Sequence, residues 1–166
     1  MIMGMTLATF TFLHVLISLV GIASGLIAMT NLLRSRPSRS WTGLFLGATI
    51  LTSATGFLFP FAKLLPSHIV GLLSLLTLAI AVFSLYGKHL SGIWRPIYVV
   101  TAVMSLYLNV FVLIVQSFLK VAPLKALAPT QTEPAFLIVQ TAALLFFAVF
   151  TIFAAVRFHP AQLRGA

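Results

Sequence analysis

The chain has 166 residues, of which 61% are hydrophobic and 7% are charged, and its formal net charge is +9. A soluble domain carries about a quarter charged residues, so this composition excludes a small soluble fold and indicates that lipid surrounds most of the protein. The basic residues are scattered between long apolar segments and form no stripe, which argues against a nucleic-acid-binding role. The absence of cysteine rules out disulfides, thiolate metal sites and cysteine catalysis.

Five segments are long enough to cross the hydrocarbon core of a bilayer as α-helices, because each holds about 20 or more mainly apolar residues. They cover approximately residues 6–33, 41–61, 67–86, 96–119 and 134–158. Short connections containing proline, glycine or basic residues separate them. We therefore predict an all-α fold, an integral membrane helical bundle of five transmembrane helices, in which residues 1–166 form a single transmembrane domain.

The distribution of lysine and arginine between the connections predicts the orientation of this bundle. One side carries seven basic residues, namely Arg34, Arg36, Arg39, Lys88, Arg95, Arg157 and Arg164. The other side carries three, namely Lys63, Lys120 and Lys125. Since short cytoplasmic loops hold the excess of positive charge in membrane proteins, we predict an N-out/C-in topology.

The first two predicted helices both contain glycines four residues apart. In the first helix, His14, Gly21 and Gly25 fall within roughly 60° of one another at 100° per residue. The second helix contains Gly43 and Gly47. Small residues at this spacing allow two helix backbones to approach closely. We expect an antiparallel hairpin in which the two glycine pairs pack against each other, with His14 on the same inward face.

The third predicted helix begins on the outer side with His68 in its first turn. The fourth carries a polar stripe on an otherwise apolar helix, and the members of the stripe fall within about 80° of one another. They are Thr101, Ser105, Asn109 and Gln116. Because an unpaired polar group in hydrocarbon is costly, we expect the stripe to face the interior of the bundle.

The fifth predicted helix follows a polar loop that ends with Glu133, the only acidic residue of the chain. Pro134 fits the first turn of a helix, where the missing N–H costs nothing. A carboxylate just before it is favourable against the helix dipole, so we expect Glu133 or Thr132 to cap this helix. Within the helix, Gln140 lies about six residues from the outer end and is expected to point inward.

Four polar side chains fall in the outer half of the predicted bundle and form the candidate ligand-binding group: His14, Asn109, Gln116 and Gln140. One interpretation is that they form hydrogen bonds that hold the helices together. The other is that they line an outward-facing site for a small ligand, a quinone or a cofactor, since an ionisable residue inside a membrane points to function. The sequence leaves both interpretations open.

Haem b is the alternative cofactor, with His14 and His68 as the candidate axial ligands from two helices. The two histidines share a side of the membrane, but His68 begins its helix whereas His14 lies two turns deep. No metal site is predicted, because no two histidines stand three or four residues apart. Paired carboxylates and a serine–histidine–aspartate triad both need acids that the chain lacks, so we assign no catalytic residue.

Two stretches, "WTGLFLGATILTSATGFLFPF" and "YLNVFVLIVQSFLKVAPLKALAPTQTEPAFLIVQ", resemble an uncharacterised family of small polytopic bacterial inner-membrane proteins. The resemblance covers residues 14–160. It implies an integral helical fold in the bacterial plasma membrane and implies no activity. In architecture alone the chain is also similar to cytochrome-b-type bundles.

The leading functional hypothesis is a non-enzymatic integral membrane protein with an outward-facing polar patch inside the membrane. It would act as an accessory subunit or as a small-ligand-binding protein. Its partners would be the lipid bilayer, a small ligand, other membrane subunits or a second copy of the chain. The alternative hypothesis is a membrane redox protein that binds haem or a quinone.

Overall fold

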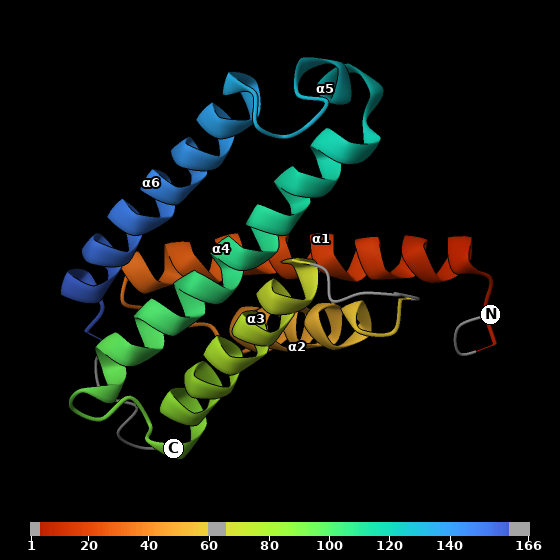
Figure 1. Ribbon diagram of the computed structural model, residues 1–166. Helices are drawn as coiled ribbons and strands as arrows, with labels where there is room; N and C mark the ends of the chain where they lie inside the picture. The colour runs from red at the N-terminus through yellow and green to blue at the C-terminus, as the bar shows by residue number, and fades with distance from the viewer. Residues whose placement is uncertain (1–3, 60–65, 160–166) are drawn as a thin grey trace.

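The computed structural model describes residues 4–59 and 66–159, and most of this part of the chain is helical (Figure 1). The elements are α1 (Leu7–Leu33), α2 (Arg39–Gly56), α3 (Pro66–Val82), the π-helical turn η1 (Phe83–Gly87), α4 (Trp94–Lys120), α5 (Ala122–Leu127) and α6 (Pro134–Arg157). The predicted all-α fold is confirmed. The short helix α5 lies in the connection between α4 and α6, which had been expected to be a loop.

Four helices in the described residues are long and apolar enough to cross a membrane, as in a multi-pass membrane protein. They are Leu7–Leu33, His68–Gly87, Trp94–Lys120 and Pro134–Arg157, and they match the first, third, fourth and fifth predicted spans. The second predicted span corresponds to α2. This helix has 18 residues and ends at Gly56, and it mixes glycine, serine and threonine with its apolar residues. The end of that predicted span, residues 60–61, lies outside the described residues.

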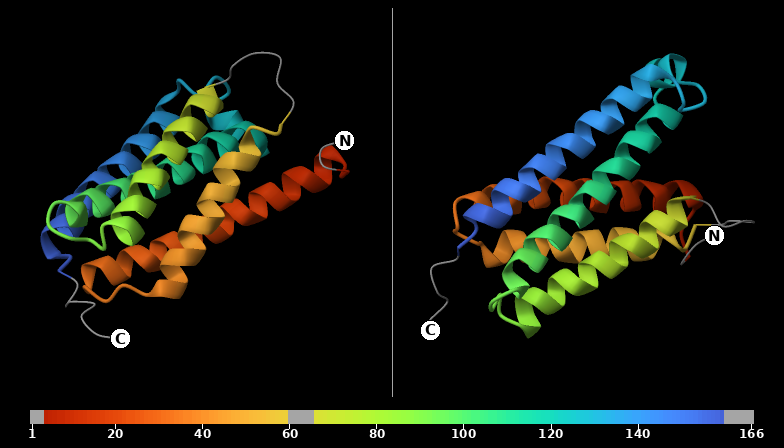
Figure 2. Two further views of the ribbon diagram at one scale, coloured as in Figure 1. Left: turned by 90° about the horizontal axis from the view of Figure 1, so that it is seen from below. Right: turned by 60° about the vertical axis from the view of Figure 1, so that its left-hand side comes forward.

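Most of the packing joins helices that follow one another in the sequence. The most extensive contact joins α1 and α2, which form an antiparallel hairpin; α3 packs against α2 and α4, and α6 packs against α4. Contacts of α1 with α4 and α6 close the bundle. Figures 1 and 2 show that the helices converge at the end where α1 and α6 finish, and that they diverge toward the opposite end.

The main hydrophobic core lies at the converging end. It includes Leu32, Phe45, Leu78, Leu106 and Phe158, all of which are buried. This packing explains the asymmetry of α1 and α2, because the buried side chains of α2 all lie between residues 42 and 49 and most of those of α1 lie in its second half. A smaller apolar cluster lies elsewhere, where α4 ends and α6 begins.

A polar contact holds the converging end together. The hydroxyl of Ser35, in the α1–α2 connection, donates a hydrogen bond to the carbonyl of Arg157 at 2.9 Å. The same oxygen accepts a hydrogen bond from the backbone N–H of His159 at 3.1 Å. Next to this contact, the buried Phe158 ring packs near Tyr98 of α4, with 6.3 Å between the ring centroids.

The glycine contacts of the α1–α2 hairpin differ from the prediction. Gly21 and Gly25 are buried, and the large side chain of Phe45 from α2 lies against Gly25. Gly43 and Gly47 are exposed, and a Cβ atom on either would meet no atom within 4 Å. The prediction that they pack against the α1 glycines is therefore wrong. Since α1 already supplies the hollow, the opposing face of α2 fills it with a large residue instead of a second small one.

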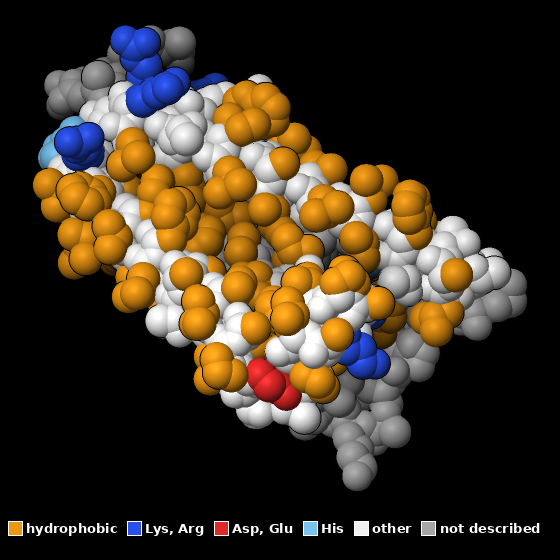
Figure 3. Space-filling view, turned by 90° about the horizontal axis from the view of Figure 1, so that it is seen from above, with side chains coloured by type: hydrophobic (Ala, Val, Ile, Leu, Met, Phe, Trp, Pro, Cys, Tyr) orange, Lys and Arg blue, Asp and Glu red, His pale blue; other side chains and the backbone are white. Residues whose placement is uncertain are grey.

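Basic side chains gather at the converging end. Of the basic residues that the structure describes, six lie there, namely Arg34, Arg36, Arg39, Lys88, Arg95 and Arg157, and two lie at the other end, namely Lys120 and Lys125. Lys63 and Arg164 lie outside the described residues. Figure 3 shows several basic groups at one end of the visible face, a basic group beside the acidic one toward the other end, and many apolar side chains between them. This separation is what a protein with its apolar band in lipid and its charges in the head-group region requires.

Candidate functional site

His14 of α1 points at α2. Its Nδ1 atom lies 2.9 Å from the hydroxyl oxygen of Thr55. Thr55 donates its only hydroxyl proton to the carbonyl of Leu51 at 2.6 Å, so it accepts the hydrogen bond from His14. The neutral imidazole therefore carries its proton on Nδ1 and keeps Nε2 as a hydrogen-bond acceptor. The ring also packs edge-on against Phe59, with 5.1 Å between centroids.

One turn further along α1, Ser18 joins α1 to α4. Its hydroxyl donates to Oδ1 of Asn109 at 2.8 Å. Asn109 is 7% exposed, and its Nδ2 atom has no hydrogen-bond partner in the part of the chain that the structure describes. The amide lies over Gly21, where a Cβ atom would come within 3.4 Å of Nδ2. Gly21 thus provides the space that lets the Asn109 amide approach α1.

Thr52 of α2 lies at the same level as Ser18. The contacts along the hairpin place Gly25 beside Phe45, and Gly21 beside Thr49. The His14–Thr55 hydrogen bond continues the same antiparallel register. Ser18 lies between His14 and Gly21 on α1, so it faces Thr52. The hydroxyl oxygen of Thr52 is buried and, like Asn109 Nδ2, has no partner among residues 4–59 and 66–159.

We call the group made by His14, Ser18, Thr52, Thr55 and Asn109 the polar layer. It lies between α1, α2 and α4, next to the region where these helices diverge (Figure 2). A buried polar atom without a partner costs about 1–3 kcal/mol. Two such atoms at one level of a helical bundle mark a place where a water molecule or a polar group of a ligand would be stabilised.

Other hydroxyl pairs between the helices are fully satisfied. Ser53 of α2 donates to Ser74 of α3 at 2.9 Å. Thr77 of α3 and Ser105 of α4 lie 2.8 Å apart, oxygen to oxygen. These pairs are hydrogen bonds that hold neighbouring helices together, so this part of the predicted polar stripe on α4 has a structural role.

The structure divides the four residues of the predicted ligand-binding group. His14 and Asn109 belong to the polar layer. Gln140 instead lies between α6 and α4, where its Nε2 donates to the carbonyl of Phe111 at 3.3 Å and its Oε1 is buried without a partner among the described residues. Gln116 is half-buried and lies two turns beyond Asn109. Because α1 crosses α4 and the two helices diverge toward the end of α4 (Figure 1), the stripe does not continue as one wall of a site.

His14 and His68 do not form a haem site in this arrangement. The ring of His68 is buried and packs against Phe57, with 5.7 Å between centroids. The ring of His14 packs against Phe59 and uses its Nδ1 atom for Thr55. Axial ligation of haem b needs two rings that face one slot, whereas these rings lie on different phenylalanines of the turn after α2. Within residues 4–59 and 66–159, no three histidine or acidic side chains gather as a metal site would need.

Glu133 occupies the N-cap position of α6, but its side chain does not cap the helix. Its carboxylate instead accepts hydrogen bonds from the backbone N–H and hydroxyl of Thr130, at 3.1 and 2.9 Å, and from the backbone N–H of Thr132 at 3.0 Å. Partial burial raises the pKa of Glu133, but these hydrogen bonds outweigh it and hold the pKa below its ordinary value. The acid therefore stabilises the turn before α6, which corrects the expected side-chain cap.

The sequence predictions for the site omitted Ser18, Thr52 and Thr55. Serine and threonine are common in membrane helices, where most bond to their own backbone, as Thr55 also does. The useful signal was that Ser18 shares the face of His14 and Gly21. No protein-family model, no curated protein and no solved structure matches this chain, so the geometry of the polar layer carries the functional argument.

Proposed function

We propose that the chain is a non-enzymatic multi-pass protein of the bacterial plasma membrane that binds a small uncharged ligand in its polar layer. The observation that carries this proposal is the pair of buried polar atoms, Thr52 Oγ1 and Asn109 Nδ2, that have no partner among the described residues although they lie at one level. The hydroxyl pairs that join α3 to its neighbours, Ser53 with Ser74 and Thr77 with Ser105, are by contrast hydrogen-bonded, and the remaining buried unpaired atoms, on Arg95 and Gln140, lie singly elsewhere in the described residues. An unmatched pair at one level is therefore best explained by a bound molecule.

The chemistry of the polar layer defines the ligand class. Asn109 Nδ2 offers hydrogen-bond donors, Thr52 offers a hydroxyl, and Nε2 of His14 offers an acceptor. The layer contains no charged group when the imidazole is neutral, and its surroundings are apolar. An ionic ligand would lose its hydration without compensation. A small neutral molecule with a carbonyl oxygen and a hydroxyl group matches these donors and acceptors.

The same proposal includes five spans and an N-out/C-in topology, with α2 as the fifth span. α2 has 18 residues and is therefore about 27 Å long at 1.5 Å per residue, close to the roughly 30 Å of hydrocarbon. It runs antiparallel to α1 along the polar layer. The excess of basic residues at the converging end supports a cytoplasmic location for that end, which places the polar layer toward the outside.

The cysteine-free chain allows a direct test with single-cysteine variants. A small membrane-impermeant methanethiosulfonate reagent is added to intact spheroplasts carrying Ser18→Cys or Thr52→Cys. Both should react from outside, more slowly than Thr130→Cys in the outer connection. Ser91→Cys in the inner connection should react only after permeabilisation. Ser105→Cys, whose residue is fully buried, should not react at all.

Two results would contradict the proposal. If Ser18→Cys and Thr52→Cys stay unmodified while Thr130→Cys reacts, the polar layer is closed and only joins helices. If Ser91→Cys reacts from outside and Thr130→Cys does not, the topology is reversed. A second experiment compares the small molecules released on denaturing the purified protein. A neutral molecule should be present in the wild type and in Gly47→Ala, and absent in Asn109→Leu; its absence from the wild type would argue against a bound ligand.

A further inference from the structure

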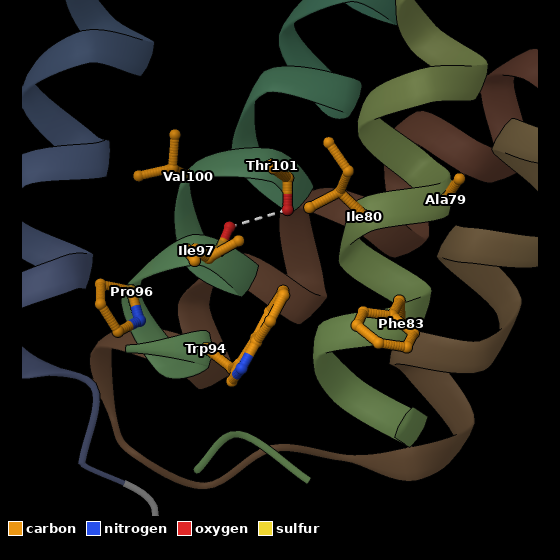
Figure 4. Close-up of a pocket in the computed structure, with 8 residues that line it drawn as sticks. All are labelled: Ala79, Ile80, Phe83, Trp94, Pro96, Ile97, Val100 and Thr101. Carbon is orange, nitrogen blue, oxygen red and sulfur yellow. Dashed lines mark hydrogen bonds between the residues drawn. The ribbon is translucent and has the colours of Figure 1, made fainter. Parts of the chain in front are cut away.

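A groove of about 770 Å³ lies between α3, η1 and α4 (Figure 4). Ile80, Phe83, Ile97 and Val100 contribute to its walls. The hydroxyl of Thr101, the only one among the labelled side chains, already donates to the carbonyl of Ile97 at 2.8 Å. Walls of this kind suit lipid acyl chains in general and select no particular molecule. Buried polar atoms with unused hydrogen-bonding capacity are found instead in the polar layer.

His14 is the titratable member of the polar layer. Its Nδ1–H donates to the hydroxyl oxygen of Thr55 at 2.9 Å, and Thr55 donates in turn to the carbonyl of Leu51 at 2.6 Å. This arrangement fixes the tautomer of the neutral ring and leaves the lone pair of Nε2 without a partner within residues 4–59 and 66–159. Histidine ordinarily changes its charge between about pH 5 and pH 8. Within that range, Nε2 changes from a hydrogen-bond acceptor into a donor.

No group of opposite charge in the described residues faces the ring of His14. From α2 and the turn that follows it, the facing side chains are those of Thr55 and Phe59, and both are uncharged. From α4, the ammonium of Lys120 acts on the ring, but it has the same sign as an imidazolium. The only acid of the chain, Glu133, is bonded within the turn before α6. A protonated His14 would therefore place a charge in apolar surroundings without a counter-ion.

We propose that the proton on Nε2 of His14 controls ligand binding in the polar layer, so that the site holds a neutral molecule while the ring is neutral and releases it when the outside becomes acidic. This inference rests on the proposed function. In the neutral state, Nε2 accepts a hydrogen bond from a hydroxyl group of the ligand. After protonation, Nε2–H points a donor at that hydroxyl group, and the hydrogen bond is lost. The proton and the ligand therefore compete for one atom, and each weakens the binding of the other.

The test measures the small molecules that co-purify with the protein. Wild-type protein is immobilised in detergent, washed at about pH 8 or about pH 5 and denatured, and the released molecules are quantified by mass spectrometry. A neutral molecule should remain after the first wash and be lost after the second. Because one proton excludes one ligand, the apparent dissociation constant should rise by at most about tenfold for each pH unit below the midpoint of the His14 titration.

His14→Gln is the variant that removes the titration. Its side-chain carbonyl oxygen accepts a hydrogen bond but takes up no proton in this pH range, so it should hold the neutral molecule at both values. His68→Gln is the matched control, because it removes a histidine outside the polar layer, and it should behave as the wild type. Equal retention by the wild type at both values, or an acid loss that persists in His14→Gln, would overturn the inference and leave the bound ligand in place. The absence of a neutral molecule from the wild type at about pH 8 would overturn the proposed function as well.

Nitrogen-15 spectra of histidine-labelled protein provide a second measurement. The signal that disappears in His14→Gln should show the Nδ1–H tautomer in the neutral state, and its titration midpoint should coincide with the midpoint of ligand loss in the wild type. An Nε2–H tautomer would contradict the hydrogen bond to Thr55 and refute the inference. If His14→Gln holds no molecule at either pH, the agreement or disagreement of the two wild-type midpoints decides.

Discussion

Replacement of Gly25 by alanine isolates the steric requirement of the α1–α2–α4 contact. A Cβ atom at this position would lie 2.8 Å from Leu106 Cδ1 and 2.8 Å from Phe45 Cδ2. Leu106 is 0% exposed and Phe45 is 2% exposed, so both contacting side chains are confined by the core. Overpacking of a well-packed core typically costs about 1–3 kcal/mol. Alanine also gains about 0.5–1 kcal/mol over glycine inside a helix, so the net loss of unfolding free energy should be about 0–2.5 kcal/mol.

Gly47→Ala is the matched control for Gly25→Ala. It adds the same methyl group to a helix, but no atom lies within 4 Å of the new Cβ. Its stability should rise by the helix gain alone, so the two variants should differ by the overpacking cost of about 1–3 kcal/mol. The assay is unfolding by sodium dodecyl sulfate in mixed micelles, followed by far-ultraviolet circular dichroism. Equal stabilities, or a larger loss in Gly47→Ala, would refute the assignment of Gly25 and Gly47 to opposite environments.

Three further predictions concern individual hydrogen bonds. Ser18→Ala removes the hydroxyl that donates to Asn109 Oδ1 and should cost about 1 kcal/mol of unfolding free energy. Asn109→Leu removes the amide itself and should cost less. A double-mutant cycle measures both costs, and a costlier Asn109→Leu would contradict this account. The lowered pKa of Glu133 means that its stabilisation of the turn before α6 is present above its ordinary pKa and lost as the pH falls through the lowered value. The protection of the amides in that turn, measured against the intrinsic exchange rate at each pH, should fall with acid, and Glu133→Gln should remove this pH dependence. Ser35→Ala removes both hydrogen bonds that this side chain makes at the converging end. It should accelerate amide exchange at residues 157–159. Unchanged protection there would show that the buried side chains alone hold the contact.

The sequence was a good guide to the helices and a poor guide to their contact faces. Pro134 begins α6 as predicted, because its missing N–H is tolerated in a first helical turn. The faces of α2 could not be assigned in the same way. In lipid, both the buried and the exposed side of a helix are apolar, so Gly47 on the outer face and Phe45 on the inner face carry no signal of their environment. Only the three-dimensional arrangement shows which glycine pair is packed.

The candidate site was predictable in part for a related reason. The inward face of His14 followed from its spacing to Gly21, and the structure brings Thr55 to meet it. The four predicted polar residues were grouped by inward face and by depth, however, and neither specifies which helix lies opposite. Asn109 meets α1, whereas Gln140 meets the backbone of Phe111. The crossing angles of the helices decide these partners, and no local pattern in the sequence encodes them.

The contact between Ser35 and residues 157–159 has a consequence for the order of assembly. Because the other extensive contacts join helices adjacent in sequence, each helix can dock on its predecessor soon after it enters the membrane, and most of the structure forms during synthesis. The buried position of Phe158 is filled only when α6 is complete. Until then, the parts of α1 and α4 at the converging end lack their final neighbour. Completion of the bundle thus requires synthesis through residue 159, and a chain that stopped earlier would lack both the Ser35 hydrogen bonds and the buried Phe158 ring.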